Sequence, residues 1–420
     1  MQMKKYNLGD IATVEISGVD KKITDGEKEI RLCNFVDVYY NWAITIAQHD
    51  SFMLATARPN EISKFQLKKG QVALTKDSET RDDIGISTYI ADDFENVILG
   101  YHCALISPNK DILDGCYLNA LLHTDYAKKY FACNASGSGQ RYALSVEALN
   151  SFPVPIIPLH EQKQIGEIFS ALDKKIELNR QINQNLEAMA KQLYDYWFVQ
   201  FDFPNEEGKP YKSSGGEMVW NEKLKRNIPV GWHCGNLFEI AVFTNGLACQ
   251  KFRPKDDEVP LPVIKIREMH DGISVDTEEV TSNIPESVKV YNGDVLFSWS
   301  ASLEVMLWAY GLGGLNQHIF KVTSANDFPK SFYYFQLLDY VDVFKKMAEA
   351  RKTTMGHITQ DHLQQSTIAI PDNKDIADKF EELISPIFKQ IVKLQEEISN
   401  FIKQRDELLP LLMNGQITIE

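Results

Sequence analysis

The chain has 420 residues, of which 44% are hydrophobic and 24% are charged, a composition typical of a folded protein with two or three domains. Its 58 acidic and 44 basic residues give a formal net charge of −14, which argues against a protein that coats nucleic acid by bulk charge but leaves room for local basic loops. The six cysteines form no Cys-x-x-Cys pair, and no apolar segment suits a signal peptide or a membrane span. We therefore expect a cytoplasmic protein with reduced thiols and no membrane partner.

Residues 1–158 form the first predicted globular domain. Short runs of β-forming residues, such as 71–75 and 104–107, alternate with Gly, Asn and Asp. An apolar periodicity then predicts a helix over residues 116–131. These signals together predict a mixed α+β domain.

Residues 159–200 follow a different, heptad pattern. One series, apolar except for Asn179, has members seven residues apart, at Ile165, Leu172, Asn179, Leu186 and Leu193. A second series fills the alternate seam, as in a coiled coil, so a long central helix is predicted here. Asn179 either fixes the register of that coiled coil or is a tolerated defect, and the sequence favours neither interpretation.

Residues 201–230 are rich in Pro, Gly and Ser and are predicted to be a connector with no core of its own. Residues 231–371 repeat the α+β signals of the first domain, with a helix predicted over 331–349. Residues 372–420 then carry a second heptad pattern. Pro386 is expected either to kink that helix or to mark a restart after Ser385.

The two globular domains resemble each other in sequence. Leu-Gly-Asp-Ile-Ala at 8–12 is echoed by Leu-Phe-Glu-Ile-Ala at 237–241, and the glycine-marked strand at 69–74 is echoed at 292–297. Two heptad segments of matched length most simply pair with each other. We therefore predict an α+β fold with two similar globular domains, separated by two long helices that pair as an antiparallel coiled coil. Packing of each helix on its own domain, or self-association of two chains, are the alternatives.

No catalytic or metal-binding motif stands out in the sequence. There is no phosphate-binding loop, no dinucleotide-binding Gly-x-Gly-x-x-Gly after a strand, no nucleophile elbow and no Asn-Pro-Pro-aromatic tetrad. Five residues of metal-binding type lie in the first domain, but their spacings match no ligand pattern: His102, Cys103, Cys116, His123 and Cys133. We therefore predict no catalytic residue and no metal site.

Binding chemistry is predicted in a small-residue loop that recurs in both domains. In the first domain the loop supplies Ser138, Gln140, Arg141 and Tyr142, and in the second it supplies Lys352, Thr353, Thr354 and His357. Small residues let backbone N–H groups approach phosphates, whereas Arg, Gln and His can read base edges in a groove. The recurrence favours DNA contact over a plain surface turn.

Further basic residues are candidates for contact with DNA, although each alone is more often a solvated charge. They are Lys64, Lys76 and Arg81 in the first domain, and Lys251, Arg253, Lys265 and Arg267 in the second. His102 and His318 occupy matching points on two predicted strands. A structural role is expected for both histidines in preference to base reading.

Three stretches of the sequence are distinctive: Phe-Pro-Val-Pro-Ile-Ile-Pro-Leu-His-Glu-Gln at 152–162, the segment 197–232 with Trp-Phe-Val-Gln-Phe-Asp-Phe-Pro and Ser-Ser-Gly-Gly-Glu-Met-Val, and Leu-Leu-Pro-Leu-Leu-Met-Asn-Gly at 408–415. Through them the chain resembles, over essentially its full length, the specificity subunit of type I restriction-modification systems. The resemblance implies two target-recognition domains, each of which reads half of a bipartite site in double-stranded DNA. The exit of the second domain, at 370–375, departs from the family pattern because it lacks the Glu-Gln pair found after the first domain.

The resemblance also implies the partners of a restriction system. Two methyltransferase subunits would carry S-adenosylmethionine and the catalytic motifs, so that no cofactor is expected on this chain, and restriction subunits would translocate and cleave DNA. One alternative is a specificity subunit that serves a methyltransferase without a nuclease. The other is a coiled-coil scaffold that joins proteins without touching DNA, which the recurring basic loop argues against.

Overall fold

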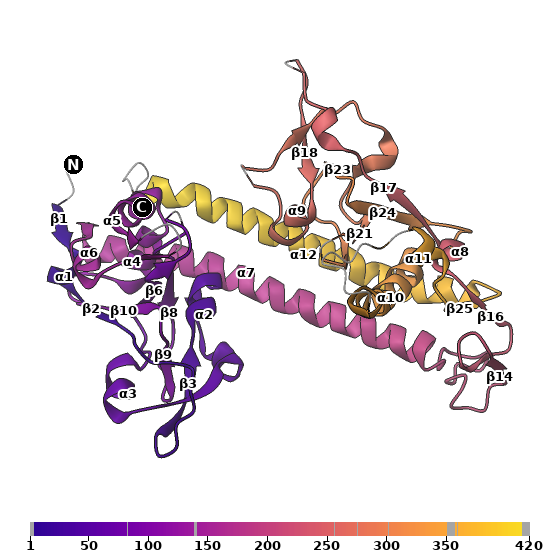
Figure 1. Cartoon of the computed structure of the whole chain (residues 1–420), viewed down its shortest axis with the longest axis horizontal. Helices are drawn as coiled ribbons and strands as arrows, with labels where there is room; N and C mark the ends of the chain where they lie inside the picture. The colour runs from indigo at the N-terminus through magenta and orange to yellow at the C-terminus, as the bar shows by residue number, and fades with distance from the viewer. Residues whose placement is uncertain are drawn as a thin grey trace. The chain divides into compact units, whose positions relative to one another are not determined.

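A computed structural model describes residues 4–81, 83–137, 141–255, 257–274, 276–300, 302–350, 358 and 360–413 (Figure 1). The chain divides into two compact units. The first comprises Met1–Glu177 with Phe401–Glu420, and the second comprises Leu178–Asn400. Each long helix, α7 (Leu159–Tyr194) and α12 (Asp375–Met413), therefore contributes residues to both units.

The first unit is built on a five-stranded sheet. Its strands, in spatial order, are β2 (Ala12–Ile16), β10 (Cys103–Pro108), β6 (Val72–Thr75), β8 (Ser87–Ile90) and β4 (Ala43–Ile44). Smaller sheets are formed by β5 (Met53–Ala57), β3 (Lys28–Cys33) and β9 (Val97–Leu99), by β11 (Ser136–Gly137), β12 (Tyr142–Ala143) and β7 (Asp77–Ser78), and by β1 (Lys4–Asn7) with β13 (Pro153–Ile156). The helices of this domain are α1 (Leu8–Ile11), α2 (Phe35–Tyr40), α3 (Pro59–Phe65), α4 (Gly115–Leu122), α5 (Asp125–Asn134) and α6 (Val146–Asn150).

The central strands β6 and β10 are buried on both faces of the sheet. Val72 and Leu74 enter one apolar cluster, whereas Ala73 enters another, because successive side chains of a strand point to opposite faces. Strands of this kind read as continuous apolar runs, which is why 71–75 and 104–107 stand out in the sequence without alternation.

The prediction of one continuous helix over residues 116–131 is wrong. The structure contains two helices, α4 and α5, with a break at His123 and Thr124. The Thr124 hydroxyl accepts a hydrogen bond from the Ala127 amide, so this residue acts as an N-cap in extended conformation. Both helices keep their apolar residues in the core, which explains why the periodicity continues across the break.

The globular domain of the second unit contains two four-stranded sheets and a pair of strands. One sheet has the order β17 (Ala241–Asn245), β24 (Ile319–Ser324), β21 (Val295–Ser298) and β22 (Glu304–Leu307). The other has the order β19 (Glu279–Val280), β18 (Leu261–Ile264), β23 (Gly313–Leu315) and β20 (Lys289–Val290), and the pair is β16 (Trp232–Gly235) with β25 (Ile368–Pro371). The helices are α8 (Leu237–Ile240), α9 (Ile266–Asp271), α10 (Lys330–Ala350) and α11 (Gln360–Gln364).

The repeat that the sequence predicts is confirmed by the strand orders. In the first domain β2, β10 and β6 lie in the order in which β17, β24 and β21 lie in the second, and all neighbours are antiparallel. Each domain is also closed by an antiparallel pair of its first and last strands, β1 with β13 and β16 with β25. Gly70 and Gly293 have positive φ angles of 94° and 87° at matching turns. Glycine adopts that conformation without a steric cost, which accounts for the shared motif.

The two long helices run antiparallel, as predicted. In the second unit the Asn179 amide donates to Glu397 Oε2 at 3.1 Å, and Asn183 donates to the Ile391 carbonyl at 3.3 Å. In the first unit Lys175 Nζ lies 5.3 Å from the centre of the Phe401 ring. Residue numbers therefore rise along α7 as they fall along α12. Because buried Asn179 has a polar partner on α12, the register-fixing interpretation is favoured over a tolerated defect.

Gln162 fixes the start of α7 against the first domain. Its side chain is fully buried, and its amide donates to the carbonyls of Ile112 and Ile157 at 2.9 and 2.8 Å. Its carbonyl oxygen accepts from the Asp114 amide at 2.9 Å. Gly166 follows one turn later, where a Cβ atom would lie 2.6 Å from that of Cys116. The Gln and Gly thus allow close contact between the helix and the domain.

One expectation about the second unit needs correction. Helix α12 continues through Pro386, so no restart occurs; burial of Phe380, Ile384 and Phe388 outweighs the hydrogen bond that proline cannot donate. The connector contributes Phe201 and Phe203 to the core cluster of the second unit. It contains a hairpin of two strands, β14 (Met218–Asn221) and β15 (Arg226–Pro229).

Candidate nucleic-acid interface

A cluster of charged side chains surrounds Asp77 in the first domain. Asp77 Oδ2 lies 2.8 Å from Lys76 Nζ, 2.5 Å from His102 Nδ1 and 3.6 Å from an Arg141 guanidinium nitrogen. Burial alone raises the pKa of the Asp77 carboxyl, but its hydrogen bonds with Lys76 and His102 outweigh burial and hold this pKa below its ordinary value. The carboxylate is therefore ionised, and it lies beside three basic side chains.

Three segments of the chain bring this cluster together. Strand β12 pairs with β7, so that Tyr142 lies opposite Ser78 and Arg141 precedes the paired segment. His102 occupies the turn before β10, with φ of 73°, and its carbonyl accepts from the Lys76 amide at 2.9 Å. The expectation that His102 lies on a strand is wrong, and the same holds for His318, which lies in the turn before β24.

Aromatic side chains border the charged cluster. The Arg81 guanidinium lies 5.1 Å from the centre of the Tyr142 ring. A hollow of about 540 Å³ is lined by Phe35, Tyr39, Tyr40, Asp83, His102 and Arg141, among others. The Tyr39 hydroxyl donates to Asp83 at 2.7 Å, and burial together with this carboxylate raises the pKa of Tyr39 to about 12. The result is a surface that combines rings with a guanidinium, both suited to contact with bases.

The structure brings together only part of the predicted set. Lys76, Arg81, Arg141 and Tyr142 lie in or beside the Asp77 cluster. Lys64 pairs instead with Glu15 at 3.1 Å. Ser138 and Gln140 in the first domain, and Lys352, Thr353, Thr354 and His357 in the second, lie outside the described residues.

The basic residues of the second domain gather around β18 and α9 with acidic partners. Lys265 Nζ lies 2.5 Å from Glu278, and Arg267 lies 2.7 Å from the buried carboxylate of Glu268. Lys265, followed by Arg253 and Arg267, lowers the pKa of Glu278. Lys251 ends a short 3-10 turn, Cys249–Lys251. Lys265 and Arg267 are thus paired with carboxylates, so their contact with a phosphate would require exchange of partners.

Sequence reasoning missed Asp77, Tyr39 and Asp83. A search for contacts with DNA selects basic and amide side chains, whereas Asp77 acts by holding them, and its partners are 25 and 64 residues distant in the chain. No signal in a single sequence reports such a pairing. Of the residues described, no group of three His, Cys, Asp or Glu side chains could hold a metal ion, and no helix is long and apolar enough to cross a membrane.

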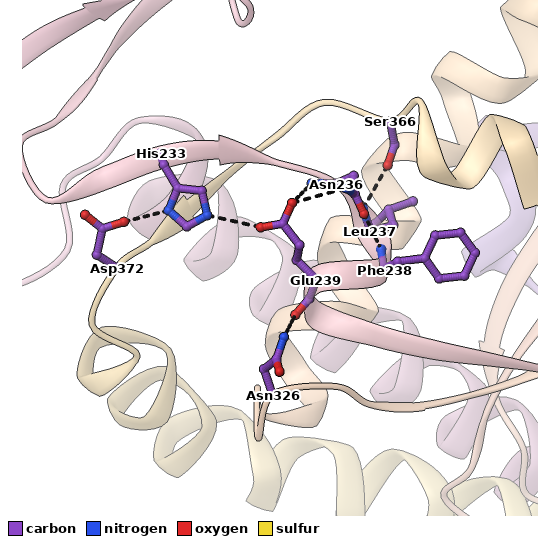
Figure 2. Close-up of polar contacts among 8 residues, drawn as sticks. All are labelled: His233, Asn236, Leu237, Phe238, Glu239, Asn326, Ser366 and Asp372. Atoms are coloured by element: carbon purple, nitrogen blue, oxygen red, sulfur yellow. Dashed lines mark hydrogen bonds and ion pairs between the residues drawn. The ribbon is translucent and has the colours of Figure 1, made fainter.

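A second polar network joins the first and last strands of the second domain (Figure 2). His233 on β16 lies between Asp372, 2.6 Å from its Nδ1, and Glu239, 3.2 Å from its Nε2. Glu239 also accepts from the Asn236 amide at 3.0 Å and so caps α8. Burial lowers the pKa of His233, but the hydrogen bonds to Asp372 and Glu239 outweigh it and raise the pKa above its ordinary value.

The raised pKa of His233 predicts a pH-dependent contribution to stability. The cation gains partners on folding, so the contribution is complete below the unfolded pKa of about 6.5 and is lost as pH rises through the folded pKa. Because the ring is half exposed, we expect less than about 1 kcal/mol. His233→Gln should lower the unfolding temperature at about pH 5.5 and have little effect at about pH 9. Exposed His160, replaced by Gln, is the control; an equal effect of His233→Gln at both values would contradict the assignment.

Comparisons with known proteins agree with the duplicated architecture. The family model described as type I restriction modification DNA specificity domain matches residues 2–188 and again 229–406. The chain is similar to the specificity subunit of the type I restriction enzyme MjaIX from Methanocaldococcus jannaschii, with 25% identity over 74% of this chain and 71% of that protein. It is also similar to the HindI specificity subunit from Haemophilus influenzae, with 24% identity over 99% of both chains.

A solved structure supports the same fold. The crystal structure of a type I restriction-modification S subunit from M. genitalium aligns with a TM-score of 0.58 and covers 98% of this chain and 96% of that one. Sequence identity between the two is 13%, so the likeness concerns the arrangement of the backbone. It includes both globular domains and both long helices, since almost all of each chain is aligned.

Proposed function

Because this chain belongs to the family of type I restriction-modification specificity subunits, we propose that each of its two globular domains reads one half of a bipartite DNA target. The observation that carries this proposal is the duplication: the same strand order and the same closing strand pair occur twice. Two similar readers in one chain suit a target with two specific parts. The proposed boundaries are residues 1–158 and 231–371 for the readers, 201–230 for the connector, and 159–200 and 372–420 for the helical segments.

The proposed DNA contacts of the first domain centre on the Asp77 cluster. Arg141 and Tyr142, with Ser138 and Gln140 of the same loop, would face base edges, while Lys76 and Arg81 would lie near phosphates. In the second domain the corresponding group comprises Lys251, Arg253, Lys265, Arg267, Lys352, Thr353, Thr354 and His357. Local basic groups of this size are compatible with the acidic chain, since only the contact surface must attract phosphate.

We assign the chemistry of the complex to its partners. Two methyltransferase subunits are proposed to bind S-adenosylmethionine and transfer the methyl group, and restriction subunits to translocate and cleave DNA. This chain would supply sequence recognition and no catalytic group. The absence of catalytic motifs from its sequence supports that division.

Exchange of the first domain tests the assignment directly. Residues 1–158 are replaced by the matching domain of another specificity subunit, and the methylated sequence is determined by methylome sequencing of cells that also express the methyltransferase subunit. We expect the first half-site to change completely, because its reader has been replaced, while the second half-site stays the same. A change in both half-sites would show that each half is read by both domains.

A further inference from the structure

The Arg141 guanidinium lies closer to the His102 ring than to the nearby Asp77 carboxylate. One of its nitrogens lies 3.2 Å from His102 Nε2 and 2.7 Å from Nδ1, but 3.6 Å from Asp77 Oδ2. Arginine normally prefers a direct, two-pronged bond to a carboxylate. Here Lys76 and His102 make the direct contacts with the Asp77 carboxylate instead.

His102 lies between Asp77 and Arg141. Its Nδ1 is 2.5 Å from Asp77 Oδ2, and one Arg141 nitrogen is 2.7 Å from Nδ1 and 3.2 Å from Nε2. Asp77 therefore holds the imidazole, and the imidazole lies against the Arg141 guanidinium.

Asp77 is held in a fixed position, whereas the Arg141 side chain is not. Asp77 is 8% exposed and lies on a paired strand, while the Arg141 side chain is 58% exposed. The backbone φ of His102 is 73°, a conformation in which residues other than glycine are strained. Strained residues of this kind persist where the side chain has a role. At 3.6 Å the Arg141 nitrogen is beyond hydrogen-bond distance of Asp77 Oδ2, so the guanidinium can exchange its contacts without breaking a bond to that carboxylate.

We propose that Asp77 and His102 are positioning residues for base recognition by the first domain. Asp77 holds the imidazole of His102, and the imidazole positions the Arg141 guanidinium until the guanidinium exchanges this contact for the O6 and N7 acceptors of a guanine edge. A guanidinium held in one orientation matches that pair of acceptors. It also loses less conformational entropy on binding than a free side chain does. The inference rests on the proposed function, because it assumes that the first domain reads DNA.

The test measures discrimination by the complex of the full chain with its methyltransferase subunits. Affinities are compared for three duplexes: the target found by methylome sequencing, the same duplex with a guanine replaced in the first half-site, and one with a guanine replaced in the second. Arg141→Gln should reduce discrimination at one guanine of the first half-site by roughly tenfold to a hundredfold. Discrimination at the second half-site should not change.

Two replacements of His102 separate positioning from folding. His102→Gly relaxes the strained backbone and removes the ring, and we expect it to reduce discrimination at the same guanine by about threefold to tenfold. His102→Asn should retain most of the discrimination, since asparagine tolerates this φ and offers both a donor and an acceptor. Asp77→Asn should behave like His102→Gly, whereas Asp20→Asn, at an exposed carboxylate of the same domain, should behave like the wild type.

A double variant provides the decisive readout. If His102 acts through Arg141, His102→Gly should cause no further loss in the Arg141→Gln background. Additive losses, an equal loss at both half-sites, or full discrimination by His102→Gly would each overturn the positioning role. Failure of the wild-type complex to distinguish the three duplexes would instead reject the proposed function, so the two failures are distinguishable.

Discussion

Replacement of Phe380 by alanine is expected to destabilise the second compact unit by about 3–5 kcal/mol. The Phe380 ring is fully buried on α12, with its centre 5.0 Å from that of Phe198 and 5.6 Å from that of Trp197. Those partners lie in a π-helical turn, Asp195–Val199, that follows α7, and the ring centre of Phe335 on α10 lies 6.1 Å away. The variant therefore removes a side chain that three elements share, and the cavity cannot close without moving a helix.

Tryptophan fluorescence during urea unfolding measures this effect, because five of the six tryptophans lie between Leu178 and Asn400. Leu383→Ala is the matched control, since that side chain is 49% exposed on the same helix. We expect the control to shift the midpoint only slightly. If both variants shifted the midpoint equally, helix propensity and not core packing would be the cause.

The architecture could be predicted because its signals are local or periodic. The heptads of both long helices need only the spacing of apolar residues, and pairing of the two follows from their matched lengths. The duplication could be recognised from turn motifs such as Gly70 and Gly293, where a positive φ requires the same residue type twice. These features do not depend on which distant residues come into contact.

Interpretations that needed tertiary context were less accurate. Thr124 divides a helix whose apolar periodicity continues, because a capping side chain competes with one more helical turn. A restart at Pro386 was one expectation for α12, but the helix continues because core packing of its neighbours overrides the local preference. Composition predicted a connector with no core of its own, and it could not show that two of its phenylalanines join the core of the second unit. At Pro386 and in the connector, the deciding energy comes from packing against other elements.

The candidate interface shows the same division. Arg141, Tyr142 and Arg81 could be selected from residue type and from the recurring loop, and they do lie near one another. The roles of Asp77 and His102 could not, because they depend on a contact between side chains distant in the sequence and on a left-handed turn. Which of the selected residues contact DNA stays a prediction that the half-site experiments address.

Lengthening both helices by one heptad is expected to lengthen the spacer between the half-sites, with both half-site sequences retained. Since Lys175 contacts Phe401 and Asn179 contacts Glu397, the junction after Glu177 faces the junction after Ile398. Seven residues inserted at each junction add about 10 Å to each helix and keep the apolar seam in register. At ~3.4 Å per base pair, we expect a spacer about three base pairs longer, determined by methylome sequencing.

The phase of the DNA helix makes this prediction sharper. Three added base pairs rotate one half-site by roughly 100° about the DNA axis, whereas a heptad changes the facing of a helix by only about 20°. The one-heptad variant should therefore bind more weakly than the wild type. Three heptads add about 32 Å, close to one DNA turn of about 34–36 Å, and should restore binding with a spacer about nine base pairs longer.

Four-residue insertions at both junctions are the control, because they displace the apolar seam and should impair assembly. Retention of the original spacer by a variant that assembles and binds would mean that the methyltransferase subunits, and not the paired helices, set the distance.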